Sequence, residues 1–236
     1  MKITWLGHAA FRYDFAGKAV LIDPFLTHNP TFKGDVAEVA RGVDHILLTH
    51  GHGDHIGDTV SIVKAAEAEG RTITVVANPE LCYYLGGQGL TALAMMGLGG
   101  VQALDGFTVA MVRADHTSGS ESPTPVYLGT PSGLIVTPTG GPGVWHLGDT
   151  DIFSDMALIS EIHKPKVAIV PIGDRFTMGP RTAALAVQRF IDVETVIPCH
   201  YGTFPLLVPD ASRFVAALEG HPVKVLVPKS GESVEV

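Results

Sequence analysis

The sequence predicts an α/β fold in which two mixed β-sheets pack together and helices cover their outer faces. Short strands with tight turns open the chain, and stretches that alternate between strand and helix follow in both halves. The composition agrees, because 46% of the 236 residues are hydrophobic and only 17% are charged, so most elements need a buried face. Two packed sheets with helices outside them are the simplest layered arrangement for such a pattern.

The first half of the chain is expected to begin with antiparallel strands and to continue with a β-α-β unit. Its expected elements are strands at 2–6, 11–15, 19–22, 44–49 and 72–77, and helices after Asp58 and from Pro79. The run at 44–49 lacks strict alternation, which is typical of a strand covered on both faces. Asp58 is placed to cap its helix, Gly70 to end it, and Pro79 suits a first helical turn.

The second half is expected to be β-rich before it alternates again. Its expected strands are 107–113, 125–130, 134–137, 144–147, 167–171, 195–198 and 223–227, and its helices are 155–162, 180–191 and 212–218. The sequence shows no repeat of fixed period and no Ser/Pro-rich linker. It therefore predicts one domain over residues 1–236.

The balance of charges argues against a nucleic-acid partner. Sixteen Lys and Arg against twenty-four Asp and Glu give a net charge of −8, and the sequence has no basic run. The N-terminus lacks the apolar stretch of a signal peptide, and two cysteines make no disulfide framework. No apolar run approaches the roughly 20 residues that span a bilayer. We therefore expect a cytoplasmic protein with a small-molecule substrate and no membrane span.

The residues at 49–55 are the strongest functional signal, and they read Thr-His-Gly-His-Gly-Asp-His. His50 and His52 are two apart, so on an extended segment their imidazoles point to the same side and can share one ion. Glycines between them let the backbone turn tightly, so that Asp54 and His55 can face a neighbouring position. Several polar groups brought together after a buried strand are compensated most simply by metal ions.

Three later residues have the same placement relative to a strand. His116 comes just beyond the strand at 107–113, Asp149 beyond that at 144–147, and His200 beyond that at 195–198. Side chains delivered to the carboxyl ends of separate strands are the arrangement expected where loops at a sheet edge build a site. We therefore expect all three to join the histidine cluster.

Taken together, the Thr-His-Gly-His-Gly-Asp-His run, a later His, a Gly-Asp-Thr and a final His resemble the metallo-β-lactamase-fold superfamily. The stretches at 5–11, 21–24 and 171–174 resemble more narrowly its small metal-dependent hydrolases related to ascorbate-6-phosphate lactonase. The resemblance implies a four-layer αβ/βα sandwich that covers essentially the whole chain. True class B β-lactamases commonly have Cys where this chain has Asp149, which argues against lactam hydrolysis.

The resemblance also implies the ligand sets of two metal ions. One ion would be held by His50, His52 and His116, and the other by Asp54, His55 and His200. Asp149 would bridge them. Imidazole and carboxylate ligands suit zinc first, with manganese, iron or nickel as alternatives.

Two ions about 3.5–4 Å apart share a hydroxide, because paired Lewis acids lower the pKa of water towards neutrality. The sequence therefore predicts a dinuclear metal-dependent hydrolase that cleaves a small ester, lactone or phosphodiester. Asp54 is expected to orient the hydroxide while it ligates. The pocket shape is expected to come from loops such as 27–41 and 97–104.

Four further residues have two interpretations each. Asp23 follows a strand and is placed to accept a hydrogen bond from a ligand histidine, or it only starts an Asp-Pro turn. His8 is placed to protonate a leaving group or contact substrate, or it is a turn residue. Asp174 and Arg175 shape the substrate pocket, with Arg175 pairing with an anion, or they form a surface ion pair.

Other functions on the same scaffold stay open at this point. An RNA-processing nuclease is disfavoured by the missing basic run and the missing inserted domain. A di-iron module that reduces oxygen or nitric oxide would usually carry a flavin-binding domain, which this sequence lacks. A metal-dependent binding protein without catalysis has no positive signal in its favour.

Overall fold

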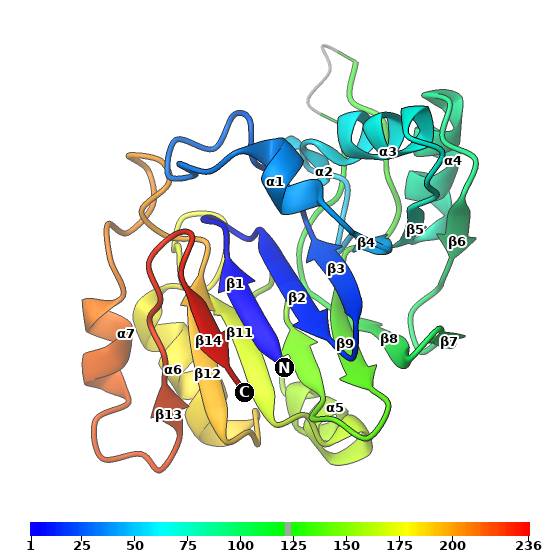
Figure 1. Ribbon diagram of the computed structural model, residues 1–236. Helices are drawn as coiled ribbons and strands as arrows, with labels where there is room; N and C mark the ends of the chain where they lie inside the picture. Colours follow the sequence, from blue (N-terminus) through cyan, green and yellow to red (C-terminus); the bar gives the residue numbers. More distant parts are fainter. Residues whose placement is uncertain (121–123) are drawn as a thin grey trace.

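Two β-sheets packed face to face form the centre of the molecule (Figure 1). A computed structural model describes residues 1–120 and 124–236, and within these residues each sheet has seven strands. In both sheets an antiparallel part continues into a parallel part, so both are mixed. The predicted pair of mixed sheets is confirmed.

The first sheet contains the N-terminal strands and one strand from the end of the chain. In spatial order its strands are β14 (Ser233–Glu235), β1 (Lys2–Trp5), β2 (Phe11–Phe15), β3 (Lys18–Ile22), β4 (His45–Leu47), β5 (Thr74–Ala77) and β6 (Leu93–Met95). The pairs from β14 to β3 are antiparallel, and those from β3 to β6 are parallel. The predicted antiparallel start is therefore correct.

The second sheet is formed by the later strands. In spatial order they are β13 (Lys224–Val225), β12 (Thr195–Cys199), β11 (Val167–Pro171), β10 (Val144–His146), β9 (Ser132–Pro138), β8 (Phe107–Arg113) and β7 (Val101–Leu104). The pairs from β13 to β10 are parallel, and those from β10 to β7 are antiparallel.

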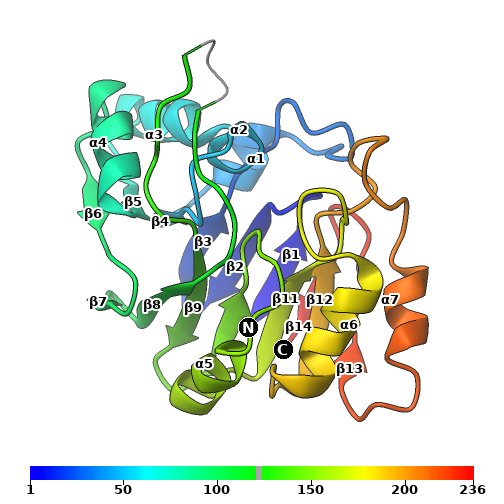
Figure 2. The same ribbon diagram turned by 180° about the vertical axis from the view of Figure 1, so that it is seen from behind.

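Helices lie outside the two sheets. On the side of the first sheet they are α1 (Val36–Ala40), α2 (Gly53–Ile56), α3 (Thr59–Ala68) and α4 (Pro79–Gly87), and on the side of the second they are α5 (Met156–His163), α6 (Pro180–Arg189) and α7 (Ser212–Ala217) (Figures 1 and 2). This is the four-layer αβ/βα sandwich that was predicted. In the described part of the chain, no helix has the length and apolar character needed to cross a membrane.

Alternation along the strands explains the packing. In β2, Phe11, Tyr13 and Phe15 are buried between the sheets, in the same hydrophobic cluster as Trp145 of β10. The strand β4 is buried on both faces, because Leu47 joins this central cluster while Ile46 joins a second cluster under α3 and α4. Removal of apolar surface from water, worth about 25 cal/mol per Å², drives both layers together.

Several local predictions were wrong. The segment 125–130 is no strand, and only its Tyr127 forms an isolated bridge, with Gly119. The short helix at 53–56 was not predicted. The short edge strands β6, β7 and β14 were not predicted. Asp58 stands at the start of α3, but its carboxylate accepts hydrogen bonds from the backbone of Leu26 and Thr27 at 2.7 and 2.9 Å instead of capping the helix.

Candidate metal centre

The predicted ligands meet at the carboxyl ends of four strands. His50 follows β4 of the first sheet, whereas His116, Asp149 and His200 follow β8, β10 and β12 of the second sheet. Ligands from the first sheet and ligands from the second sheet thus meet where the strands of both sheets end. Chain order alone does not place these segments side by side.

Backbone strain gathers at the same place. Among the described residues, seven other than glycine have positive φ, and five of them are predicted site residues. They are His8, Asp23, Asp174, Arg175 and His200, with φ between 44° and 63°. Such conformations cost roughly 1–3 kcal/mol each, and they persist where surrounding structure holds a functional geometry.

One group of nitrogen atoms comes from His50 and His52, which follow β4, and from His116, which follows β8. His50 Nε2 lies 2.9 Å from His52 Nδ1, and the ring of His116 lies 5.1 Å from each of their rings. One ligand atom from each of the three histidines falls within 4.8 Å of the other two. These are the three residues that the resemblance assigned to one ion.

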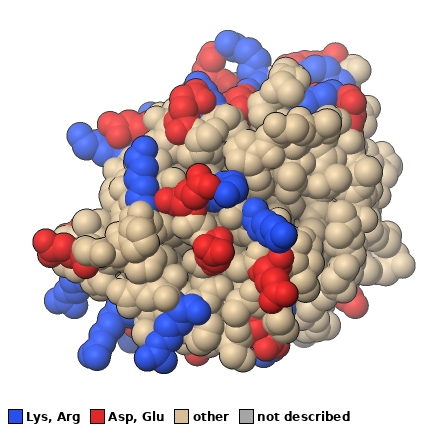
Figure 3. Space-filling model, turned by 90° about the horizontal axis from the view of Figure 1, so that it is seen from below, with Lys and Arg blue, Asp and Glu red and all other residues tan. Residues whose placement is uncertain are grey.

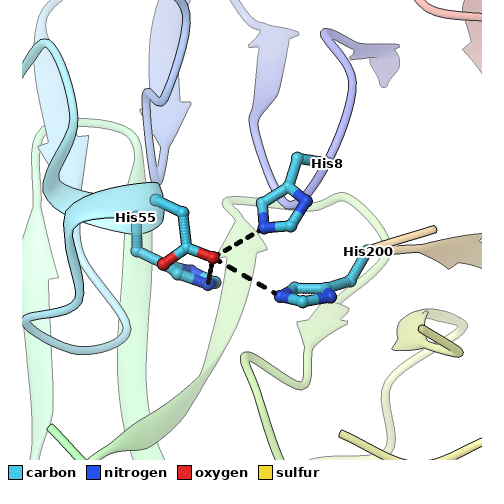
Figure 4. A group of neighbouring side chains, drawn as sticks. His8, His55 and His200 are labelled. Carbon is cyan, nitrogen blue, oxygen red and sulfur yellow. Dashed lines mark hydrogen bonds and ion pairs between the residues drawn. The ribbon is translucent and has the colours of Figure 1, made fainter. Parts of the chain in front are cut away.

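A second group surrounds the carboxylate of Asp54. Its Oδ2 atom lies 2.9 Å from His8 Nε2, 3.8 Å from His200 Nε2 and 4.0 Å from His55 Nε2 (Figure 4, dashed lines). The imidazoles of His8 and His200 reach this oxygen from segments distant in sequence, whereas His55 follows Asp54 directly in α2. His8 is an addition to the set that the resemblance assigned to the second ion.

Asp149 lies between the two groups. Its Oδ2 atom is 3.0 Å from His200 Nε2 and 3.3 Å from His55 Nε2 in the second group, and 3.5 Å from His116 Nε2 in the first. The residue is buried, with 3% of its surface exposed. One carboxylate thus contacts members of both groups.

The donor atoms in these groups fit a metal ion. Among the described residues, Nε2 of His55, Nε2 of His200 and Oδ1 of Asp149 are buried without a hydrogen bond of acceptable geometry. Each buried polar atom left unpaired costs about 1–3 kcal/mol. Three at one spot, all of them imidazole nitrogens or carboxylate oxygens, are compensated by a cation with a preference for nitrogen and oxygen ligands.

Two of the histidines are oriented from behind by Asp23. This buried carboxylate accepts hydrogen bonds from His55 Nδ1 at 2.7 Å and from the hydroxyl of Thr49 at 2.6 Å. The same Thr49 oxygen lies 3.0 Å from His50 Nδ1. A proton held on Nδ1 of both rings leaves their Nε2 lone pairs directed into the site.

Charge and burial set the protonation of the centre. Burial lowers the pKa of His50 well below its ordinary value, so the imidazole is neutral. Burial alone would raise the pKa of Asp149, but His200 and His55 hold it well below the ordinary range. Burial alone would lower the pKa of His55, but Asp149 and other carboxylates raise it well above its ordinary value. In the absence of a cation these carboxylates favour a second proton on His55, at Nε2, and a cation bound at Nε2 takes the place of that proton.

A cavity of about 480 Å³ opens beside the two groups. Its wall includes five of the predicted ligands and six residues that sequence reasoning missed, namely Thr117, Ser118, Gly119, Ser120, Pro125 and Phe176. The prediction that loops 27–41 and 97–104 shape the pocket was wrong, because 36–40 is helix α1, 101–104 is strand β7, and neither segment contributes to the wall. The sequence feature that could have indicated these wall residues is the hydroxyl-rich stretch directly after His116.

Asp174 and Arg175 lie beside this cavity and do not line it. The Asp174 carboxylate accepts a hydrogen bond from the Arg175 backbone at 2.9 Å, and the Arg175 guanidinium lies 5.9 Å from the ring centre of Phe176. Both therefore shape the loop that places Phe176 on the wall.

A larger hollow of about 900 Å³ lies at the ends of α5 and α6, and His221 is its single described histidine.

Comparisons with known proteins show the family of this chain. The beta-lactamase superfamily domain matches residues 18–201. A UPF0173 metal-dependent hydrolase of Azorhizobium caulinodans is 76% identical over all of both chains, and one of Xanthobacter autotrophicus is 63% identical over 100% of this chain and 98% of its own.

Solved structures give the same result. Igni18, a metallo hydrolase from the archaeon Ignicoccus hospitalis, superposes with a TM-score of 0.87 at 32% identity, over 99% of this chain and 97% of its own. An isothiocyanate hydrolase from Delia radicum gut bacteria shares the fold, with a TM-score of 0.76 at 19% identity over 100% and 99% of the two chains. These matches, together with the converging imidazoles and carboxylates, show that the chain belongs to the metallo-β-lactamase-fold superfamily, among its metal-dependent hydrolases.

Proposed function

We propose that this protein hydrolyses a small ester, lactone or phosphodiester at a centre of two divalent metal ions. The observation that carries the proposal is the position of Asp149 Oδ2, within 3.5 Å of nitrogens from both histidine groups. A carboxylate in that position suits a bridge between two ions. We further propose that residues 1–236 act as one catalytic domain in the cytoplasm.

The proposed ligands follow the two groups. His50, His52 and His116 would hold one ion, while Asp54, His55 and His200 would hold the other, and Asp149 would contact both. When bound, the two ions would supply the Lewis acidity that turns a shared water into a hydroxide nucleophile and polarises the substrate. The nitrogen and oxygen donors favour zinc, with manganese, iron or nickel as alternatives.

The experiment that tests this function begins with the metal. Elemental analysis of protein purified without added metal is expected to give two equivalents per chain. The purified protein is then assayed on a panel of activated esters, lactones and phosphodiesters, and at least one of them is expected to be cleaved.

We expect His52→Ala and Asp54→Ala to lower that activity by at least about 100-fold, because loss of a ligand costs no less than loss of a group that only supports one. Circular dichroism serves as the check that both variants are folded. His221→Ala, at the distant hollow beside α5, is the matched control and is expected to keep full activity. Full activity in both His52→Ala and Asp54→Ala would contradict the proposal.

His8 is buried and has hydrogen-bond partners on both ring nitrogens, so its position favours a role through Asp54 over direct contact with substrate. An ionised carboxylate only accepts hydrogen bonds, so His8 Nε2–H donates to Asp54 Oδ2 at 2.9 Å. Its Nδ1 then accepts from the hydroxyl of Thr203, also at 2.9 Å, whose other partner, the carbonyl of Tyr201, is farther at 3.3 Å. Thr203 thereby sets the tautomer that holds Asp54.

This role makes the metal affinity depend on a hydroxyl that is no ligand. Thr203→Val keeps the side-chain shape and removes the donor, and we expect it to weaken metal binding by about 10–100-fold, as loss of such supporting contacts usually does. Competition with a chelator measures the affinity. Thr203→Ser should restore it, and Thr108→Val, at an exposed position of β8, is the control. Equal affinity of Thr203→Val and the parent protein would exclude the role.

Neither alternative gains support from the described residues. On the face seen from below, Lys and Arg side chains are interspersed with Asp and Glu (Figure 3). Lys166, for example, forms an ion pair with Glu194 at 2.6 Å. A nuclease would instead show RNA cleavage with strong salt dependence. A di-iron redox module would show bound iron, a visible absorption band and electron transfer in place of hydrolysis.

A further inference from the structure

We propose that the substrate is an uncharged ester or lactone with an apolar group next to the scissile bond, and not a phosphate-bearing or otherwise anionic molecule. This inference rests on the proposed hydrolytic function and concerns the wall of the 480 Å³ cavity. The metal groups form the floor of that cavity and would hold the reacting atoms. The remainder of the substrate must lie against the outer wall.

The outer wall lacks a positive charge. Of the described residues that line the cavity, none is Lys or Arg, and the charged ones are Asp54 and Asp149. The undescribed positions next to it in sequence, 121–123, are Glu, Ser and Pro, so they add no cation. Proteins bind phosphate and carboxylate groups with Arg, Lys or helix N-termini, because a desolvated anion needs a counter-charge. An anionic tail would find no such partner here.

Two of the wall hydroxyls hold the backbone of the loop after His116 in place. Ser118 Oγ donates to the carbonyl of Leu128 and accepts from Gly51 N–H, both at 3.0 Å. Ser120 Oγ accepts from the backbone of Val126 at 3.0 Å. These contacts fix the loop after His116 against its neighbours and use both the donor and an acceptor site of Ser118, so of the wall hydroxyls Ser118 offers little to a substrate.

An exposed phenylalanine supplies the remaining surface. Phe176 lines the cavity, yet 53% of its surface is accessible. It is carried by a strained loop, since Asp174 and Arg175 both have positive φ, and the Phe176 backbone donates to the carbonyl of Asp174. Large apolar side chains displayed at the mouth of a cavity are typical of ligand contacts, because a bound apolar group removes them from water.

Arg175 is the cation that a competing anionic substrate would use. Its guanidinium lies against the Phe176 ring, 5.9 Å from the ring centre, outside the cavity lining. In that position it supports the ring by a cation–π contact. The experiment must therefore distinguish support of Phe176 from capture of an anion.

The test uses the metal-loaded enzyme and p-nitrophenyl esters with one leaving group. From acetate to hexanoate we expect kcat/KM to rise by about three- to fourfold for each methylene that is buried. The half-ester of succinate, which is anionic, is expected to react at least about tenfold more slowly than the neutral butyrate ester, a loss on the scale of one unpaired charged contact. Phe176→Ala should flatten the chain-length series. Tyr83→Ala, which removes an even more exposed aromatic on α4, should not.

Binding of unreactive amides gives a readout without turnover. Hexanamide is expected to bind more tightly than succinamate by calorimetry, and Phe176→Ala to reduce the difference by weakening the binding of hexanamide. A preference for the anionic compounds that Arg175→Gln abolishes would overturn the inference, as would a flat ester series in the parent enzyme. If no ester, lactone or phosphodiester is cleaved, the proposed function fails, while the order of amide binding still decides the preference of the pocket.

Discussion

Replacing Asp149 with asparagine is expected to remove one metal equivalent per chain and to lower kcat by about 10³-fold, the upper end for loss of one group that stabilises transition-state charge. The substitution keeps the side-chain shape and deletes the charge. Asp149 Oδ2 lies within 3.5 Å of nitrogens in both groups, so both proposed ion positions lose the same ligand. Elemental analysis and steady-state kinetics measure the two effects.

Asp151→Asn is the matched control for this substitution. Asp151 is exposed and two residues further along the same loop, and its carboxylate only accepts a local hydrogen bond from Ile152 N–H at 2.7 Å. It is expected to keep both metal equivalents and full activity. An Asp149→Asn protein that still binds two equivalents would show that the carboxylate does not bridge them.

Gly173→Ala is expected to disable the second group by moving His200. A Cβ atom at position 173 would overlap the carbonyl oxygen of His200 and lie 2.9 Å from its Nδ1, which are closer approaches than side chains tolerate. Because Gly173 follows β11 and His200 follows β12, the clash separates the two loops where these paired strands end. We expect a loss of about 1–3 kcal/mol in the free energy of unfolding, the usual cost of overpacking.

Gly173→Ala is expected to affect the catalytic rate of the proposed metal centre more than the stability of the fold, because catalytic geometry tolerates only small displacements. A shift of about 1 Å in a ligand costs about 100-fold in rate, which we expect for kcat of Gly173→Ala. Gly97→Ala is the control, since a Cβ there meets no heavy atom within 4 Å and φ is not positive. Crystal structures, metal analysis and urea unfolding of both variants test the prediction. Unchanged metal content and kcat in Gly173→Ala would contradict it.

The sequence predicted those parts of the fold that depend on local pattern. The strands β2, β8 and β11 have the predicted bounds, because each alternates or is uniformly apolar between clear turn signals. The short strands β6, β7 and β14 escaped prediction because they lie at or beside sheet edges and owe their form to pairing with a neighbour. Asp58 lies at the start of its helix as predicted, but its carboxylate accepts hydrogen bonds from a segment more than thirty residues away in sequence.

By itself the sequence determined the fold class, the donor types and the positions at strand ends where those donors stand. These follow from periodicity and from the rule that parallel strands end at one edge, both of which are readable along the chain. Only the tertiary structure decided that Thr203 supports His8, that Asp23 orients His50 and His55, and that Phe176 faces the cavity. Those contacts join residues far apart in sequence, and their geometry depends on how the two sheets pack, which no local pattern specifies.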